Sequence, residues 1–436
     1  TIDGLLAGGY RYEWESAHHN WAAVCAGGVG GAALWLLDDA DELALLLGRL
    51  GPAFDSYLAG FPPDGSCLEG MGYWTYGFGY FVAFAELLRE RSSGAIDLLG
   101  APSLVGKLGE IARFPQRCRL VGEASLNFSD ASPPFRYPLG TMCALASRLP
   151  GVLLPDFKLS EELEYDHCRR WAKAVRDFAW FDHEAPSLDK AEEGRFVTTC
   201  LAGAQWAIAR APYFEPPIAF AAKGGTHDEP HNHNDIGAFI LVAGDEATLD
   251  DFGAGRYDRG YFGPERYDYF VTSSFGHSVP IVDGLGQKAG KEYLCNAARF
   301  ESRPLGLACR FEISSAYGVA GLESLERGFD CDASREALLT IEDGYRFAST
   351  GRREIKERFV SLLPARKESE YEVALVGKSS SLRLRAATRP TRIEISEKSF
   401  EAHRGPPKTA TIIDFVYEPE EKAFELAFEY RFMLES

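Results

Sequence analysis

The chain has 436 residues, of which 46% are hydrophobic and 25% are charged. This length fits two domains, and the composition is ordinary for a globular protein. The formal net charge of -18 disfavours nonspecific binding to nucleic acid or to anionic membranes, and no apolar run is long enough to span a bilayer.

The nine cysteines are scattered, odd in number and without a CxxC pair. This pattern favours buried thiols in a reducing compartment, and no signal peptide is visible, so a cytoplasmic location is favoured. The chain starts at Thr1 rather than at Met. Removal of a leader would make a secreted or periplasmic location the alternative. Nothing in the sequence indicates an oligomeric state.

Residues 20–211 are expected to be mainly helical. Segments 31–50 and 80–91 have apolar residues at spacings of three and four, with charged residues on the other face. Segments 161–180 and 197–210 are further helix candidates. The loops between these helices contain Gly, Pro and aromatic residues, and we expect the chemistry to lie on such loops.

Segment 63–80 (PDGSCLEGMGYWTYGFGY) is expected to be a loop, with Tyr73, Tyr76 and Tyr80 among five glycines. Glycine allows a ligand to approach the backbone closely, and exposed aromatic rings suit stacking against sugars. The alternative is a glycine-rich turn whose tyrosines cap the helix bundle.

Three polar residues, His18, His19 and Asn20, directly precede a predicted helix. A helix N-cap would explain Asn20 but not the two histidines beside it. Further along, the polar loop 127–136 offers Asp130 and Arg136 as weaker ligand-binding candidates.

The periodicity changes near residues 212–217 (PYFEPP), after which apolar and polar residues alternate. The clearest case is 424–434 (FELAFEYRFML), and segments 382–385, 392–395 and 409–417 repeat the pattern. Many short alternating strands predict an antiparallel sandwich. We therefore expect a helical domain over residues 1–213 and a β domain over residues 214–436.

The run 229–239 (EPHNHNDIGAF) contains two histidines two residues apart, His231 and His233, at the expected start of a strand. Together with Asp251 and His277 from adjacent strands, this pattern suits a zinc site with one position left for water. Asp250 competes with Asp251 as the carboxylate ligand. The alternative is a set of solvated loop histidines and a turn aspartate.

The segments KGGTHDEPHNHNDIGAFILVAGDEATLDDFG and SSFGHSVPIVDG resemble the heparinase II/III-like family of polysaccharide lyases. HNWAAVCAGGVGGAAL, PDGSCLEGMGYWTYG and NFSD resemble further motifs of that family, so the resemblance covers roughly residues 16–290. It implies an α + β multidomain fold, an incomplete α/α toroid of helical hairpins followed by an antiparallel β-sandwich, with the active site at their junction. Early helices of the toroid are expected to be absent. No GxSxG, P-loop, GxGxxG or HExxH motif supports another chemistry.

The resemblance also implies β-elimination in a uronate-containing polysaccharide, which leaves a 4,5-unsaturated uronate. Tyr76 matches the catalytic tyrosine, as acid and for some substrates also as base, and His231 matches a catalytic histidine. Asn20 matches the residue that pairs with the uronate carboxylate, and His19 is a candidate to share that role.

The same resemblance implies a structural zinc ion at His233, Asp251 and His277. The substrate-binding candidates are Tyr73, Trp74, Tyr80, Glu69 and Asp130. Tyr73 and Tyr80 compete with Tyr76 for the catalytic role.

The expected partner is an anionic polysaccharide, and neither nucleic acid nor a membrane. The negative net charge and the lack of an arginine beside Asn20 favour a less sulfated glycosaminoglycan or another uronate polymer. The alternatives are a zinc-dependent hydrolase and a non-catalytic carbohydrate-binding relative. Because His231 and His233 would share a face of a strand but have different roles, the resemblance predicts a bend or bulge between them.

Overall fold

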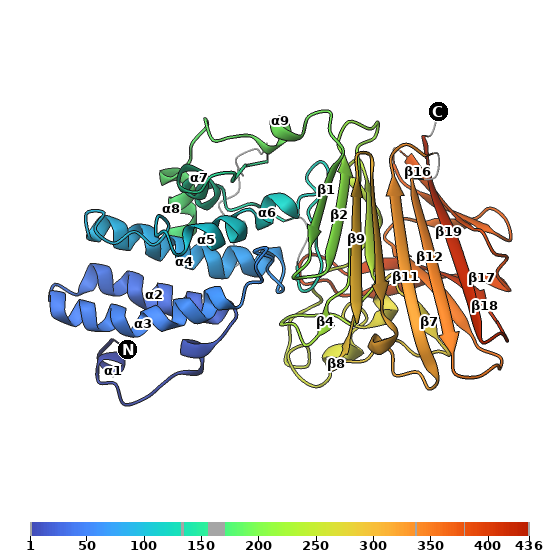
Figure 1. Ribbon diagram of the computed structural model, residues 1–436, viewed down its shortest axis with the longest axis horizontal. Coiled ribbons are helices and arrows are strands. Elements are labelled where there is room, and N and C mark those ends of the chain that lie inside the picture. The colour runs from blue at the N-terminus through green and yellow to red at the C-terminus, as the bar shows by residue number, and fades with distance from the viewer. Residues whose placement is uncertain (1, 132–134, 156–170, 336–337, 379, 435–436) are drawn as a thin grey trace. The chain divides into compact units, whose positions relative to one another are not determined.

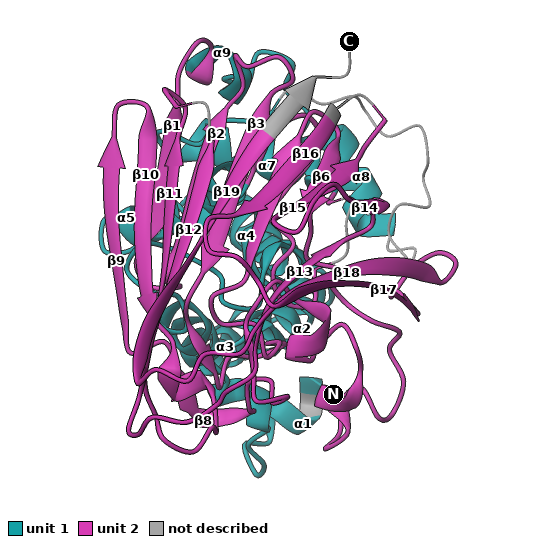
Figure 2. Ribbon diagram, turned by 90° about the vertical axis from the view of Figure 1, so that its right-hand side faces the viewer, with its two compact units in different colours: residues 1–118, 136–191 teal, residues 119–135, 192–436 magenta. Residues whose placement is uncertain are grey.

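The computed structural model describes residues 2–131, 135–155, 171–335, 338–378 and 380–434. The chain divides into two compact units (Figure 2). The helical unit comprises Thr1–Cys118 and Arg136–Ala191, and the β unit comprises Arg119–Phe135 and Glu192–Ser436. Residues 119–135 and 192–213, which we placed in the helical domain, therefore belong to the β unit.

In the helical unit, α2 packs against both α3 and α4, and Figure 1 shows the three helices side by side. No helix among the described residues is both long enough and apolar enough to cross a membrane. The helices are α1 Ile2–Leu6, η1 Glu13–Ser16, α2 Asn20–Leu36, α3 Ala40–Ala59, α4 Met71–Arg91, α5 Val105–Ala112, α6 Phe114–Arg117, α7 Leu139–Arg148, α8 Trp171–Ala179 and α9 Leu188–Glu192.

Glycines allow α2 and α4 to approach closely. A Cβ atom added at Gly30 would lie 2.6 Å from the Phe84 ring, and one added at Gly27 would lie 3.0 Å from the Tyr80 carbonyl oxygen. A side chain at Gly30 would therefore force the Phe84 ring to move, and one at Gly27 would press on the backbone at Tyr80, so both glycines favour this packing. The close packing of α2 against α4 explains why these glycine-containing segments form helices.

Two predictions for the helical unit were wrong. The expected helix 31–50 is interrupted after Leu36, and a new helix begins at Ala40 because the Asp39 side chain accepts hydrogen bonds from the backbone of the first turn. The expected loop 63–80 is helical from Met71 onward, because burial against α2 outweighs the low helix propensity of Gly and Tyr. Of segment 161–180, Trp171–Ala179 is helical and residues 161–170 lie outside the described part of the chain.

The predicted helix over residues 197–210 was also wrong. The segment forms an antiparallel hairpin of β1 (Val197–Leu201) and β2 (Trp206–Ala211), with Gln205 at φ 55° in the turn. Val197 and the two threonines after it are β-branched and favour a strand, whereas the alanines that suggested a helix are compatible with either. The change to strands therefore occurs before residue 197 rather than near residue 212.

The β unit contains a five-stranded sheet (β1-β2-β3-β5-β6), an eight-stranded sheet (β14-β15-β16-β19-β12-β11-β10-β9), a four-stranded sheet (β17-β18-β13-β7) and the pair β4-β8. Figure 1 shows β11 and β12 as long neighbouring strands. The remaining bounds are β3 Ile218–Lys223, β4 Thr226–His227, β5 Phe239–Ala243, β6 Glu246–Leu249, β7 Ile281–Val282, β8 Gly290–Leu294, β9 Ala297–Arg303, β10 Gly306–Glu312, β11 Leu322–Asp332, β12 Leu339–Phe347, β13 Ile355–Ser361, β14 Ala365–Lys367, β15 Glu372–Val376, β16 Ser380–Ala386, β17 Arg392–Phe400, β18 Lys408–Tyr417 and β19 Ala423–Leu434.

A large hydrophobic core is shared by strands of these sheets, and a smaller cluster around Phe252 and Phe400 lies apart from it. The ring of Phe239 on β5 packs against Phe329 on β11 at 5.3 Å and Tyr430 on β19 at 5.9 Å. Along β19, Leu426, Phe428 and Tyr430 are buried, as the alternating pattern predicted. The expectation of an antiparallel sandwich is confirmed, and the eight described cysteines are free.

Candidate active and metal site

Asp130 is the centre of a buried hydrogen-bond network in the β unit. Its Oδ2 accepts from His231 Nδ1 and from Arg266, both at 2.9 Å. Its Oδ1 accepts from His233 Nε2 at 3.0 Å and from the Tyr261 hydroxyl at 2.5 Å. Four donors fill the acceptor capacity of one carboxylate. Asp130 is therefore positioned to orient the two histidines, whereas we had predicted that it binds substrate.

The charge of Asp130 is stabilised by this network. Burial alone would raise the pKa of the carboxyl group, but the hydrogen bonds from His231 and His233 and the charge of Arg266 hold it well below its ordinary value. An ionised Asp130 accepts the Nδ1–H of His231, which leaves Nε2 as the basic nitrogen of the neutral ring.

The run 231–235 is an irregular loop rather than the start of a strand. His231 has φ 60°, and β5 begins only at Phe239. A positive φ is uncommon for a residue other than glycine and reverses the chain direction locally. The predicted irregularity next to His231 is present. Both histidine rings contact the carboxylate of Asp130, and His233 also belongs to a buried cluster with Asp251 and His277.

Four buried residues of the β unit form a potential metal site, namely His233, Asp235, Asp251 and His277, whose ligand atoms all lie within 4.8 Å of one another. Within the described residues, His233 Nδ1, His277 Nδ1 and Asp251 Oδ2 are buried without a hydrogen-bond partner. Buried polar atoms are normally paired, so three such atoms converging on one point fit a cation.

In His277 and in His233, the hydrogen bond made by Nε2 leaves the lone pair of the ring on Nδ1. Nε2 of His277 donates to the Val271 carbonyl at 2.8 Å, and Nε2 of His233 faces Asp130. Each ring therefore presents an unprotonated Nδ1 to the cluster, as metal-binding histidines do. Burial also lowers the pKa of His277 to about 3, so that its imidazole is neutral.

The structure distinguishes the carboxylates. Asp251 belongs to the cluster and Asp250 does not, since Asp250 Oδ1 faces Asn127 Nδ2 at 3.5 Å. Asp235, which we had not predicted as a ligand, binds Lys223 Nζ through both oxygens at 2.8 and 3.0 Å. Because the Lys223 charge occupies Asp235, the three predicted residues are the stronger ligand set.

Arg327 anchors two loops to the sandwich core, and these loops carry residues of the cluster. One of its nitrogens donates to the carbonyl groups of Gly237 at 3.2 Å and Ser278 at 2.9 Å. The guanidinium is fully buried and also binds Asp343 and Glu357. Gly237 follows Asp235 by two residues and Ser278 follows His277 by one, so Arg327 fixes the backbone at both places.

In the helical unit, Asn20 is held by Glu69. Glu69 Oε1 accepts the backbone N–H of Asn20 at 3.0 Å, and Oε2 accepts from Asn20 Nδ2 at 2.5 Å. Asn20 is the first residue of α2 and His19 is its N-cap, so Asn20 is not the cap itself. Glu69 is buried and serves Asn20, although we had predicted that it contacts substrate.

A second polar group, the hydroxyl of Tyr57, lies next to Gly77, as Asn20 does. A Cβ atom added at Gly77 would lie 3.0 Å from Asn20 Cβ and 2.7 Å from the Tyr57 hydroxyl. Within the described residues, neither Asn20 Oδ1 nor the Tyr57 hydroxyl has a hydrogen-bond partner, and both are buried. Tyr57, which the sequence did not reveal, thus joins the predicted Asn20 at this place.

The three predicted tyrosines lie on α4 at spacings of three and four residues, so they share a face of the helix. All three are partly exposed, and the rings of Tyr76 and Tyr80 are 5.6 Å apart. Trp74 is instead fully buried and donates its indole N–H to the Ile111 carbonyl at 2.8 Å. The prediction that Trp74 binds substrate was therefore wrong, because its ring is part of the helical core.

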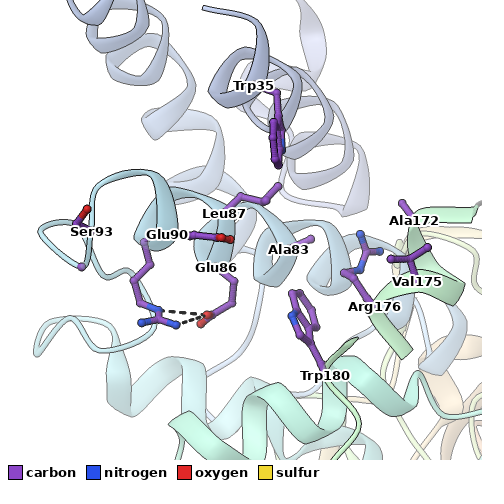
Figure 3. Close-up of a pocket in the computed structure, with 12 residues that line it drawn as sticks. Trp35, Ala83, Glu86, Leu87, Glu90, Ser93, Ala172, Val175, Arg176 and Trp180 are labelled. Atoms are coloured by element: carbon purple, nitrogen blue, oxygen red, sulfur yellow. Dashed lines mark hydrogen bonds and ion pairs between the residues drawn. The ribbon is translucent and has the colours of Figure 1, made fainter. Parts of the chain in front are cut away.

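A groove of about 660 Å³ in the helical unit contains none of the predicted residues. Figure 3 shows its apolar lining by Trp35, Leu87 and Trp180, with Arg176 at one side. The candidate chemistry is therefore not associated with this groove.

No family model matches the sequence, and no curated protein matches it. Solved structures do match. A crystal structure of heparinase III has a TM-score of 0.72 and 12% identity, covering 100% of this chain and 64% of that one. Heparan sulfate lyase HepC from Pedobacter heparinus has a TM-score of 0.66 and 12% identity, covering 100% and 62%.

Chondroitin AC lyase from Streptomyces coelicolor A3, in complex with chondroitin sulphate, has a TM-score of 0.51 and 10% identity, covering 99% of this chain and 70% of that one. At such identities the likeness concerns the fold. It confirms the expected α + β multidomain class and the resemblance to heparinase-like lyases at the level of fold. The chain spans 62% of the length of the heparan sulfate lyase.

Proposed function

We propose that this chain is a polysaccharide lyase that cleaves a uronate-containing polysaccharide by β-elimination and leaves a 4,5-unsaturated uronate. The observation that carries the proposal is the pairing of His231 with the buried, ionised Asp130. This pairing fixes the ring and its tautomer, as a general base requires. The fold of the neighbouring lyases supports the same class of enzyme.

The reaction needs three groups, and the chain supplies a candidate for each. Nε2 of His231 takes the C5 proton of the uronate, which becomes acidic only when the adjacent carboxylate is neutralised. The amide of Asn20 binds that carboxylate and stabilises the enolate-like intermediate, with His19 beside it. The Tyr76 hydroxyl protonates the departing O4, and no water enters the products.

The metal fits a structural role. We propose that His233, Asp251 and His277 hold a zinc ion, which when bound supplies a cross-link between the loops that carry them. A hydrolase would need an open coordination position for water. The four residues of the cluster are only 0–2% exposed, which favours the structural role over a zinc hydrolase.

The proposed partner is an anionic polysaccharide. The neighbouring structures are described as lyases of heparan sulfate and chondroitin, whose chains contain uronate. With a net charge of -18, this chain is better suited to a less sulfated glycosaminoglycan or another uronate polymer than to a strongly sulfated one.

The proposal is tested by incubating the protein with hyaluronan, chondroitin sulfates, heparan sulfate and alginate while ultraviolet absorbance is followed. Elimination forms a conjugated, absorbing product, and hydrolysis does not. Rising absorbance on at least one polymer is the expected result. Chain shortening without absorbance would indicate the hydrolase, and binding without cleavage would indicate a non-catalytic carbohydrate-binding protein.

A further inference from the structure

Phe262 is a large apolar side chain exposed beside His231. The ring is 58% exposed, and its centroid lies 6.3 Å from that of His231 in an edge-to-face arrangement. It belongs to a loop that turns sharply at Gly260 and Gly263, whose backbones are hydrogen-bonded to each other at 2.9 Å. An exposed phenylalanine next to a candidate catalytic base requires an explanation.

Other aromatic rings hold Phe262 in place at the surface. Tyr257 packs against it at 4.8 Å and Tyr261 at 5.6 Å, both nearly perpendicular. Tyr261 is itself fixed through its hydroxyl to Asp130, and the ring of Tyr257 packs against that of His403 at 4.0 Å in a tilted arrangement. The ring is therefore held beside His231 by the same network that orients the base.

The loop that contains His403, on which Tyr257 packs, is also held in place by hydrogen bonds. The backbone of His403 donates to the Ala254 carbonyl at 2.9 Å, and that of Arg256 donates to the Glu401 carbonyl at 3.2 Å. An aromatic ring supported by two connected loops is a preorganised apolar surface, which loses little conformational freedom when a ligand covers it.

The charge around this surface suits an anionic ligand. Segments 256–266 and 401–408 contain five Arg and Lys residues against three Asp and Glu residues, whereas the whole chain has 46 against 64. Arg259 and Arg404 are exposed. Although Arg266 pairs with Asp130 and Arg256 with Glu401, the region presents exposed cationic side chains on an acidic protein, which attract a polyanion.

We propose that Phe262 forms a sugar-binding subsite, whose ring packs against the apolar face of a pyranose unit of the uronate polymer next to the sugar on which His231 acts. This inference rests on the proposed function. The C–H-rich face of a pyranose ring matches an exposed aromatic face, and the carboxylates of the polymer match the surrounding arginines. Phe262 thus contributes to substrate affinity and not to proton transfer.

The test compares Phe262→Ala, Phe262→Tyr and the control Tyr213→Ala, which removes another exposed aromatic ring of the β unit (41% exposed). Steady-state elimination is measured on the polymer of the panel that is cleaved fastest. Affinity is measured by calorimetry with the same changes in a Tyr76→Phe background, so that turnover does not interfere. If no polymer is cleaved, the one that binds most tightly is used.

Phe262→Ala should raise KM and weaken affinity by about tenfold, with kcat within about twofold, whereas Phe262→Tyr and Tyr213→Ala should behave as the parent does. Unchanged affinity in Phe262→Ala would overturn the subsite while leaving the lyase proposal intact. If the parent cleaves no polymer but Phe262→Ala still weakens binding, the lyase proposal would be refuted and the subsite would be kept. Failure of the parent to bind any of the polymers would overturn the subsite as well.

Discussion

Nδ1 of His277 lies 3.5 Å from Oδ2 of Asp251, and within the described residues neither atom has a hydrogen-bond partner. Burial raises the pKa of Asp251 well above its ordinary value, with the charge of Asp235 adding to the effect. A divalent cation between these atoms would offset the cost of burying the carboxylate.

We therefore predict one equivalent of zinc per chain in the native protein and almost none in His277→Ala. A bound metal at a thousandfold excess over its Kd stabilises the folded state by about 4 kcal/mol, which for a unit of this size raises Tm by roughly 10 °C. Elemental analysis and thermal melts with and without a chelator measure both effects. The control His183→Ala changes an exposed histidine and should keep its zinc. A native protein that lacks zinc and melts identically with chelator would contradict the metal site.

Asp130→Asn should reduce elimination on the order of 100-fold, because an amide cannot accept four hydrogen bonds and no longer fixes the His231 ring. Leaving Arg266 without its counter-charge should also lower the free energy of unfolding by about 3 kcal/mol. Steady-state rates and denaturant titrations measure the two effects. The control is Asp245→Asn, which alters an exposed carboxylate elsewhere in the β unit. Equal activity in Asp130→Asn and the native protein would refute the role of Asp130.

Arg327→Lys should weaken zinc binding by about tenfold, because a lysine cannot bind both loop carbonyls and both carboxylates at once. Competition with a chelator measures the affinity, and the visible spectrum of the cobalt-substituted protein reports the geometry of the ligands. Arg210→Lys is the matched control, since Arg210 is a buried arginine bound to Glu192 at 2.8 Å. Both variants should lose stability, but only Arg327→Lys should alter the spectrum. Identical cobalt spectra would show that Arg327 supports the fold alone.

Glu229 should make stability depend on pH. Burial raises its pKa from 4.5 to about 7, and the backbone N–H of Thr226 donates to its Oε1 at 3.2 Å. A carboxyl group with a raised pKa favours the folded state fully below pH 4.5 and loses that contribution as pH rises through about 7. The loss is on the order of 3 kcal/mol. Denaturant titrations between these pH values should show a shallower decline for Glu229→Gln than for the native protein. Parallel curves for the two proteins would contradict the prediction, and Glu215→Gln, an exposed change, should follow the native curve.

Much of the β unit could be predicted from the sequence because its strands are half-buried. Leu382 and Leu384 alternate with arginines, and the structure buries the leucines as expected. The hairpin at Val197–Leu201 was missed because its strands lack this alternation, with all of Trp206–Ala211 buried. Where both faces of a strand are buried, the pattern of period two disappears.

The proposed metal ligands could be selected from the sequence to a similar degree. His233, Asp251 and His277 are suggested by their pattern and by the family resemblance, but the choice of Asp251 over Asp250 depends on turn geometry. The role of Asp130 could not be derived from spacing, because its contact with His231 spans 101 residues and depends on the path of residues 119–135 into the β unit. A polar loop of ordinary composition carries no local signal of such a distant partner.

We propose that this chain catalyses β-elimination through Tyr76. The most direct test is the initial rate of ultraviolet absorbance increase for Tyr76→Phe on the preferred polymer, measured beside the native protein, Tyr73→Phe and Tyr80→Phe. We predict that Tyr76→Phe loses on the order of 1,000-fold in rate while its affinity for the polymer stays near normal, and that the other two variants remain active. A full rate in Tyr76→Phe would contradict the claim.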